Sequence, residues 1–278
     1  MKKLFRTLLA TAALVVGGGS LATPFVAQAA EPVKVKLGLT GDDTRVWDNV
    51  KERLAKEGIE IEYVKFTDYS QPNAALADGS IDLNAFQHQI FLDSYNAEHK
   101  TDIVSIGNTV NAPLGIYSDK IKDVKDLKEG AKIAIPNDPT NGGRALRLLQ
   151  SAGLIKVDES KGYKPTVSDI TENKLKLDIQ ELDASQTARA LPDVDVAIIN
   201  SGVAVDAGFL PTKDAIFLEP VDDKSKPYVN VIAVRKEDEQ NDIYQKIVDF
   251  YQTDETKKVI EEVSKGSHIP AWETFGRK

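Results

Sequence analysis

Residues 33–66 read VKVKLGLTGDDTRVWDNVKERLAKEGIEIEYVKF, and this stretch decides the fold class. Residues 33–39 alternate in period two, as in a strand with one buried face. A polar turn at residues 41–44 offers short side chains that can cap the helix that follows. That helix is expected to stop at Gly58, and residues 59–66 then form a second strand rich in β-branched and aromatic side chains. A strand, a helix and a strand in this order predict a parallel βαβ unit.

The same alternation of strands and helices continues along the chain and predicts an α/β protein with a largely parallel, doubly wound sheet. It restarts after Pro113, which indicates a second α/β lobe without a long linker. We therefore expect a two-lobed fold, with one lobe from residues 31–112 plus 229–278 and the other from residues 113–228. A small ligand would lie in the cleft between the lobes.

Residues 1–30 have the features of a secretory signal peptide. Basic residues precede an apolar run at residues 8–16, and residues 27–29 read AQA, with small side chains where a signal peptidase cleaves. The alternative is a membrane anchor, but that apolar run is about half of the roughly 20 residues needed to span a bilayer. The chain contains no cysteine, so it lacks the lipobox residue that would carry a lipid. We expect an exported protein in a periplasm or at a cell surface, without a lipid anchor.

Composition and motifs argue against several classes of function. The formal net charge of −8 disfavours nucleic acid or an anionic membrane as a partner. The chain has three histidines and no cysteine, and it lacks nucleophile-elbow, P-loop and zinc-protease motifs. The spacing of His88, His99 and His268 follows no metal-ligand pattern. We predict no catalytic residues, no metal and no cofactor, although an enzyme on a two-lobed fold stays an alternative.

Residues 140–144, TNGGR, are predicted to lie at the start of a helix. The free amides and the dipole of a helix N-terminus favour an anion, and Arg144 can add a charge-assisted pair to a carboxylate. Gly142 and Gly143 would let the backbone approach a ligand closely. The alternative is a structural helix cap with a surface arginine.

Three aromatic side chains lie where the expected elements meet loops, and they could wall a pocket. Phe86 lies at a strand end, Phe91 one turn into the next helix, and Tyr69 on an earlier loop. Aromatic rings pack well against a thioether sulfur. The alternatives are that the phenylalanines belong to the core and that His88, between them, has a structural role.

Two asparagines stand in or beside apolar strands. Asn200 closes the run VAII at residues 196–199, and Asn230 interrupts an apolar run at residues 228–232. A buried amide without a partner costs about 1–3 kcal/mol. Each asparagine therefore either bonds neighbouring backbone or meets a ligand ammonium group.

Taken together and in order, these segments resemble the NlpA-type family of methionine-binding lipoproteins, the substrate-binding subunits of methionine ABC importers. The resemblance extends over about residues 33–263, and its specific motifs are FQH at residues 86–88 and PNDPTN at residues 136–141. It implies a periplasmic-binding-protein fold that closes on its ligand. It also implies that Arg144 and Asn141 hold the ligand carboxylate. In the same way, it implies that Asn200 and Asn230 bind the ligand ammonium group. The side-chain pocket would be formed by Tyr69, Phe86 and His88.

One position departs from the family pattern. Phe91 stands where members commonly have tyrosine, so a hydroxyl is missing near the end of the side-chain pocket.

Together, the sequence features and this resemblance predict a monomeric solute-binding protein that captures L-methionine or a close relative and delivers it to an ABC permease. A methionine-containing dipeptide or another small amino acid is an alternative ligand, and a surface adhesin is an alternative outside this class.

Overall fold

A computed structural model describes residues 31–278. The predicted signal peptide, residues 1–30, lies outside the described residues. Among residues 31–278, no helix is both long and apolar enough to cross a membrane.

The first sheet has six strands in the order β13-β4-β12-β3-β1-β2. It confirms the βαβ unit predicted at the start of the chain, because β1 pairs in parallel with β2 from Val33–Ile59 to Thr40–Phe66, with helix α1 between them. The bounds of its strands are β1 Val33–Thr40, β2 Ile59–Phe66, β3 Leu83–Asn84, β4 Val104–Asn111, β12 Val229–Val234 and β13 Ile269–Pro270.

The second sheet has five strands in the order β11-β5-β10-β6-β9. Its central strands pair in parallel, whereas β5 runs antiparallel to β10 and β11. The bounds are β5 Gly115–Tyr117, β6 Lys132–Pro136, β9 Asp178–Leu182, β10 Val196–Ile199 and β11 Phe217–Leu218. A separate two-stranded ribbon joins β7 (Lys156–Val157) to β8 (Ile170–Glu172).

The chain passes between the two sheets at one place. It leaves the six-stranded sheet at Asn111, enters β5 at Gly115, and returns through a 3-10 helix, η5 (Asp223–Tyr228), into β12. The first residue of β12, Val229, pairs with Asn111, so the exit and the return are neighbours. This is why β12 runs antiparallel to β3 and β4. The prediction of a largely parallel sheet was therefore wrong for the six-stranded sheet, which is mixed.

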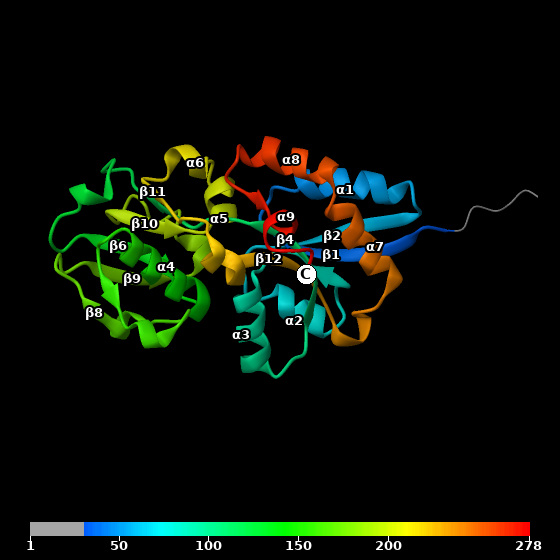
Figure 1. Ribbon diagram of the computed structural model, residues 1–278, viewed down its shortest axis with the longest axis horizontal. Coiled ribbons are helices and arrows are strands. Elements are labelled where there is room, and N and C mark those ends of the chain that lie inside the picture. Colours follow the sequence, from blue (N-terminus) through cyan, green and yellow to red (C-terminus); the bar gives the residue numbers. More distant parts are fainter. Residues whose placement is uncertain (1–30) are drawn as a thin grey trace, which may run out of the picture. The chain divides into compact units, whose positions relative to one another are not determined.

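Helices cover both faces of the six-stranded sheet (Figure 1). On one face, α1 (Arg45–Ala55), α7 (Asp242–Tyr251) and α8 (Asp254–Ser264) pack on side chains of β1 and β12. On the other face, α2 (Pro72–Ala77) and α3 (Gln89–His99) enclose a second apolar cluster. β12 contributes to both clusters, with Ile232 in the first and Val231 in the second, as the period of a strand requires.

The five-stranded sheet is covered in the same way. Helix α4 (Pro139–Ser151) packs its apolar side chains on one face, and α5 (Ser201–Asp206) contributes to a smaller cluster on the other. The remaining helices are short, namely α6 (Pro211–Asp214) and α9 (Ala271–Thr274). The predicted α/β fold is thus confirmed: two sheets, each between helices, share one pair of crossing segments.

Candidate functional site

One cavity brings together all eight side chains that the sequence singles out. Residues of both sheets and their loops line this cavity, and its volume is ≈ 200 Å³. Pockets for drug-sized ligands are larger, at roughly 300–1,000 Å³, so this cavity suits a ligand of amino-acid size. The eight predicted residues in its wall are Tyr69, Phe86, His88, Phe91, Asn141, Arg144, Asn200 and Asn230.

Helix α4 supplies two of them, and residues 140–144 lie at its start as predicted. The helix begins at Pro139, and Asp138 caps it by accepting hydrogen bonds from the amides of Thr140 and Asn141 at 3.1 and 2.9 Å. The carboxylate of Asp138 therefore already occupies the anion site of this helix terminus.

Close packing, rather than the approach of a ligand, explains the two glycines of this turn, Gly142 and Gly143. A Cβ on Gly142 would lie 2.8 Å from the carbonyl oxygen of Pro136, and one on Gly143 would lie 2.6 Å from that of Tyr163. These distances are shorter than a side-chain carbon tolerates. The two glycines therefore let α4 pack closely on neighbouring backbone.

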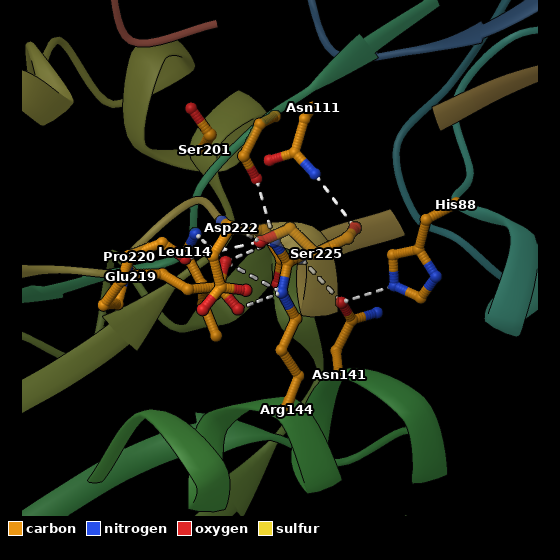
Figure 2. Close-up of polar contacts among 12 residues, drawn as sticks. His88, Asn111, Leu114, Asn141, Arg144, Ser201, Glu219, Pro220, Asp222 and Ser225 are labelled. Atoms are coloured by element: carbon orange, nitrogen blue, oxygen red, sulfur yellow. Dashed lines mark hydrogen bonds and ion pairs between the residues drawn. The ribbon is translucent and has the colours of Figure 1, made fainter. Parts of the chain in front are cut away.

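Arg144 is buried, with 3% of its side chain exposed, and it is not a free surface cation. Its Nε and Nη2 donate to the carboxylate of Glu219 at 2.9 and 2.5 Å, as Figure 2 shows. Nη2 also donates to the carbonyl oxygen of Ala112, and the guanidinium lies over the ring of Tyr228 at 4.3 Å. Arg144 is thus fixed in place by an acid, a carbonyl and an aromatic face.

A buried network of amides shapes the loop that carries Phe86 and His88. Asn73 and Gln87 exchange hydrogen bonds at 2.7 Å, and Asn84 donates to Asn73 at 2.9 Å. All three side chains are buried. Within the FQH motif, Gln87 therefore fixes the loop through buried hydrogen bonds, and Phe86 and His88 on either side of it line the cavity.

His88 is a neutral hydrogen-bond donor in this cavity. Its Nδ1 accepts from the amide of Phe91 at 3.1 Å, so the hydrogen of a neutral ring lies on Nε2, which is 3.3 Å from Oδ1 of Asn141. Burial, together with the nearby charge of Arg144, lowers the pKa of His88 to about 3. The bond to Asn141 joins the two halves of the cavity, because His88 follows β3 and Asn141 lies on α4.

Asn200 offers an unused acceptor to the cavity. Its Nδ2 donates to Oδ1 of Asn141 at 2.8 Å, whereas its own Oδ1 is buried and has no hydrogen-bond partner among residues 31–278. A buried carbonyl oxygen without a donor costs about 1–3 kcal/mol. A ligand ammonium group would supply that donor.

Three aromatic rings form a triangle in the wall of the cavity, which we call the aromatic triangle. The ring centroids of Tyr69, Phe86 and Phe91 lie 5.8–6.2 Å from one another. Two of the three pairs meet edge to face, which is a favourable arrangement for aromatic rings. The triangle provides an apolar, polarisable surface for a ligand side chain.

Sequence reasoning missed a polar group at another part of the cavity wall. Ser201, at the start of α5, lies 2.9 Å from Nε2 of His268, which precedes β13. Burial lowers the pKa of His268 to about 4. Asp43 and Asp206 also line the cavity, and Asp206 accepts from the amide of Asp42 at 3.2 Å. The sequence carried no signal for these contacts because the partners are far apart in the chain.

Glu219 is the other residue that the sequence did not reveal. It follows the edge strand β11, and no motif marks it. Only an indirect argument could have predicted an acid at this place: a buried arginine such as Arg144 needs an acidic partner.

The fold and this cavity define a class of protein: a two-lobed, α/β solute-binding protein of the periplasmic type. Ser201 and His268 form a hydroxyl–imidazole pair, but the nearby acid, Asp43, is paired with Arg45 at 2.6 Å. Among residues 31–278, no group of three or more metal-ligating side chains is placed to hold a metal ion.

The chain belongs to the NlpA lipoprotein family, whose profile matches residues 35–272. It is 45% identical over 242 residues to a probable D-methionine-binding lipoprotein MetQ of Vibrio cholerae, which covers 86% of this chain and 88% of the relative. Solved structures are similar in fold as well, including two from Staphylococcus aureus and Burkholderia cenocepacia. Protein PG110 of Staphylococcus aureus has a TM-score of 0.83 at 52% identity, covering 85% of this chain and 93% of that one. A nutrient-binding protein of Burkholderia cenocepacia, solved with bound methionine, has a TM-score of 0.82 at 46% identity, covering 85% and 99%.

Proposed function

We propose that this protein captures L-methionine, or a close relative of it, and delivers it to an ABC import permease. The observation that carries the proposal is the convergence of three features on one cavity: a buried cation at Arg144, an unpartnered oxygen on Asn200, and the aromatic triangle. A carboxylate, an ammonium group and a thioether side chain complement these features in turn. The relatives support methionine as the ligand: one is named for D-methionine binding and another was solved with bound methionine.

In this proposal, each site residue has a defined role. Arg144 and Asn141 hold the carboxylate, whereas Asn200 and Asn230 take the ammonium group. The aromatic triangle and His88 surround the side chain. The lobes are residues 31–112 plus 229–278 and residues 113–228, and they close on the ligand about the two neighbouring crossing segments.

The proposal includes export and a monomeric state. The leader-like residues 1–30 would direct the chain to a periplasm or a cell surface. The relative from Vibrio cholerae is named a lipoprotein, whereas this sequence contains no cysteine that could carry a lipid. A methionine-containing dipeptide is the alternative ligand, since it presents the same side chain and a terminal carboxylate.

Binding calorimetry tests the proposal directly. The protein lacking residues 1–30 is unfolded and refolded to remove copurified ligand, and is titrated with L-methionine, D-methionine, glycyl-methionine, other amino acids and taurine. We expect the methionine ligands to bind more tightly than the other amino acids and taurine, because only they present a thioether to the aromatic triangle. If the refolded protein binds none of these ligands, the proposed function is wrong.

Replacing Phe91 by tyrosine should change the order of ligand affinities more than it changes stability. The new hydroxyl would lie in the aromatic triangle and offer a hydrogen bond to a polar side-chain end. We expect a larger gain for methionine sulfoxide than for methionine in calorimetry, with a stability change of about 1 kcal/mol or less. Phe250→Tyr, a partly buried ring outside the cavity, is the matched control. An unchanged order would remove Phe91 from the ligand pocket.

A further inference from the structure

Glu219 connects the ligand cavity to the segment by which the chain first leaves the six-stranded sheet. Its Oε2 accepts from the amide of Leu114 at 3.0 Å, and its own amide donates to the carbonyl oxygen of Leu114 at 2.9 Å. Arg144 donates to Ala112 in the same segment at 3.1 Å. The ion pair of Arg144 and Glu219 is therefore anchored to backbone on both sides (Figure 2).

This arrangement determines which part of Arg144 a ligand can meet. Glu219 engages Nε and Nη2 on one edge of the guanidinium, and Tyr228 covers a face. Among residues 31–278, Nη1 is the one guanidinium nitrogen of Arg144 without a protein hydrogen bond. A ligand carboxylate can thus meet Nη1, but it cannot take the Nε/Nη2 edge of the guanidinium unless Glu219 is displaced.

The ion pair also sets the charge of the cavity. Arg144 is the only lysine or arginine among the residues that line it in the described part of the chain, and Glu219 balances its charge. Asp43 and Asp206 add acids to the wall. A ligand with a carboxylate and no ammonium would therefore bring an unbalanced negative charge into a cavity whose cation is already paired.

We infer that Glu219 is a positioning and selectivity residue, which holds Arg144 in place and makes the site prefer zwitterionic ligands to anionic ones of the same shape. This inference rests on the proposed function, because it concerns the same site. Arg144 without Glu219 would attract any carboxylate. Arg144 with Glu219 accepts a carboxylate well only when an ammonium group accompanies it.

The test compares two ligands that differ in one group: L-methionine and its hydroxy analogue, 2-hydroxy-4-(methylthio)butanoate. Calorimetry gives the ratio of their affinities for the wild type, for Glu219→Gln and for Glu219→Asp. We expect Glu219→Gln to shift this ratio toward the anionic analogue on the order of tenfold, because a unit charge next to the site is removed. Glu219→Asp keeps the charge and should keep the preference, with weaker binding of both ligands. Glu129→Gln breaks an exposed ion pair with Lys176 and serves as the matched control.

Each result has a defined meaning. A merely structural role for Glu219 would weaken both ligands together in Glu219→Gln, and an unchanged ratio would overturn the inference while leaving the proposed function intact. If Glu219→Gln does not fold, a Glu219→Asp protein that loses the preference for methionine also overturns it. A wild type that binds neither ligand would instead overturn the proposed function, and the inference with it.

Discussion

Replacing Arg144 by alanine should lower both ligand affinity and folding stability by large amounts. The loss of a charge-assisted hydrogen bond to the ligand carboxylate removes roughly 1.5–3 kcal/mol, or about ten- to a hundredfold in affinity. The stability loss has another cause, because Glu219 would remain largely buried without its cation. Breaking a buried ion pair from one side costs about 3–5 kcal/mol.

A double variant separates these two effects. Arg144→Ala with Glu219→Gln removes both charges, so it should recover much of the lost stability but none of the lost affinity. Urea denaturation with an unchanged m value measures the first quantity, and calorimetry with L-methionine measures the second. Affinity that returns with stability would mean that Arg144 acts only through the fold.

Arg147 provides the control for this pair of experiments. It lies on the same helix as Arg144, one turn further along, but it pairs with exposed Glu159 and does not line the cavity. Exposed ion pairs contribute about 0–1 kcal/mol. Arg147 also donates a hydrogen bond to the carbonyl oxygen of Gly162, so Arg147→Ala should leave affinity unchanged and reduce stability by about 1–2 kcal/mol, less than Arg144→Ala.

Local sequence patterns were sufficient for the main strands and helices and for the side chains that line the cavity. The alternating residues 33–39 indicated a strand with one buried face, and the apolar run of residues 196–199 indicated a strand buried on both faces. Both segments are strands in the structure. Tyr69, Phe86 and Asn200 lie at the ends of such elements, where the chain turns into loops or helices. Because the ends of these elements in both sheets border the same cavity, residues that the sequence indicated separately lie together in its wall.

Contacts between distant segments were beyond this reasoning. Arg144 was expected as a free anion receptor, yet its main partner is Glu219, 75 residues away. Ser201 and His268 are separated by 67 residues, and nothing near either residue indicates the other. The sequence could show that a buried charge would need a partner, but only the packing of β11 beside β5 decides which acid is close enough.

Helix α4 shows the same limit on a smaller scale. The turn PNDPTN predicted a helix start, and Asp138 with Pro139 is a strong combination of cap and first residue. The prediction placed the ligand carboxylate at this terminus because it treated the first amides as free. Asp138 satisfies two of them within the chain, which leaves side chains such as Arg144 to meet the ligand.

Acidification from pH 6.5 to pH 5 should destabilise the protein through its two buried histidines. Burial holds the pKa of His88 at about 3 and that of His268 at about 4, whereas an unfolded chain has histidine pKa values near 6.5. Between these values the unfolded state binds protons that the folded state excludes, so stability falls as pH falls. In this window each histidine lowers the free energy of unfolding by at most about 1.4 kcal/mol for each pH unit of acidification.

Urea denaturation at pH 7, 6.5, 6, 5.5 and 5 measures this slope. Ligand affinity of the folded protein should stay nearly constant in the same window, because His88 and His268 remain neutral in the folded state and keep their hydrogen bonds to Asn141 and Ser201. Carboxylates such as Asp169, whose hydrogen bonds with Thr166 lower its pKa to about 2, add their own loss only at lower pH, which is why the range stops at 5.

Variants assign the slope to its source. His88→Asn with His268→Asn removes both titrating groups, so its stability should change much less between pH 6.5 and 5 than that of the wild type, even if the variant is less stable at every pH. His99→Asn replaces an exposed histidine at the end of α3 and should keep the wild-type slope. A wild type whose stability is constant from pH 6.5 to 5 would show that these histidines are protonated in the folded protein, and that the hydrogen bond from Nε2 of His88 to Asn141 is not the bond of a neutral ring.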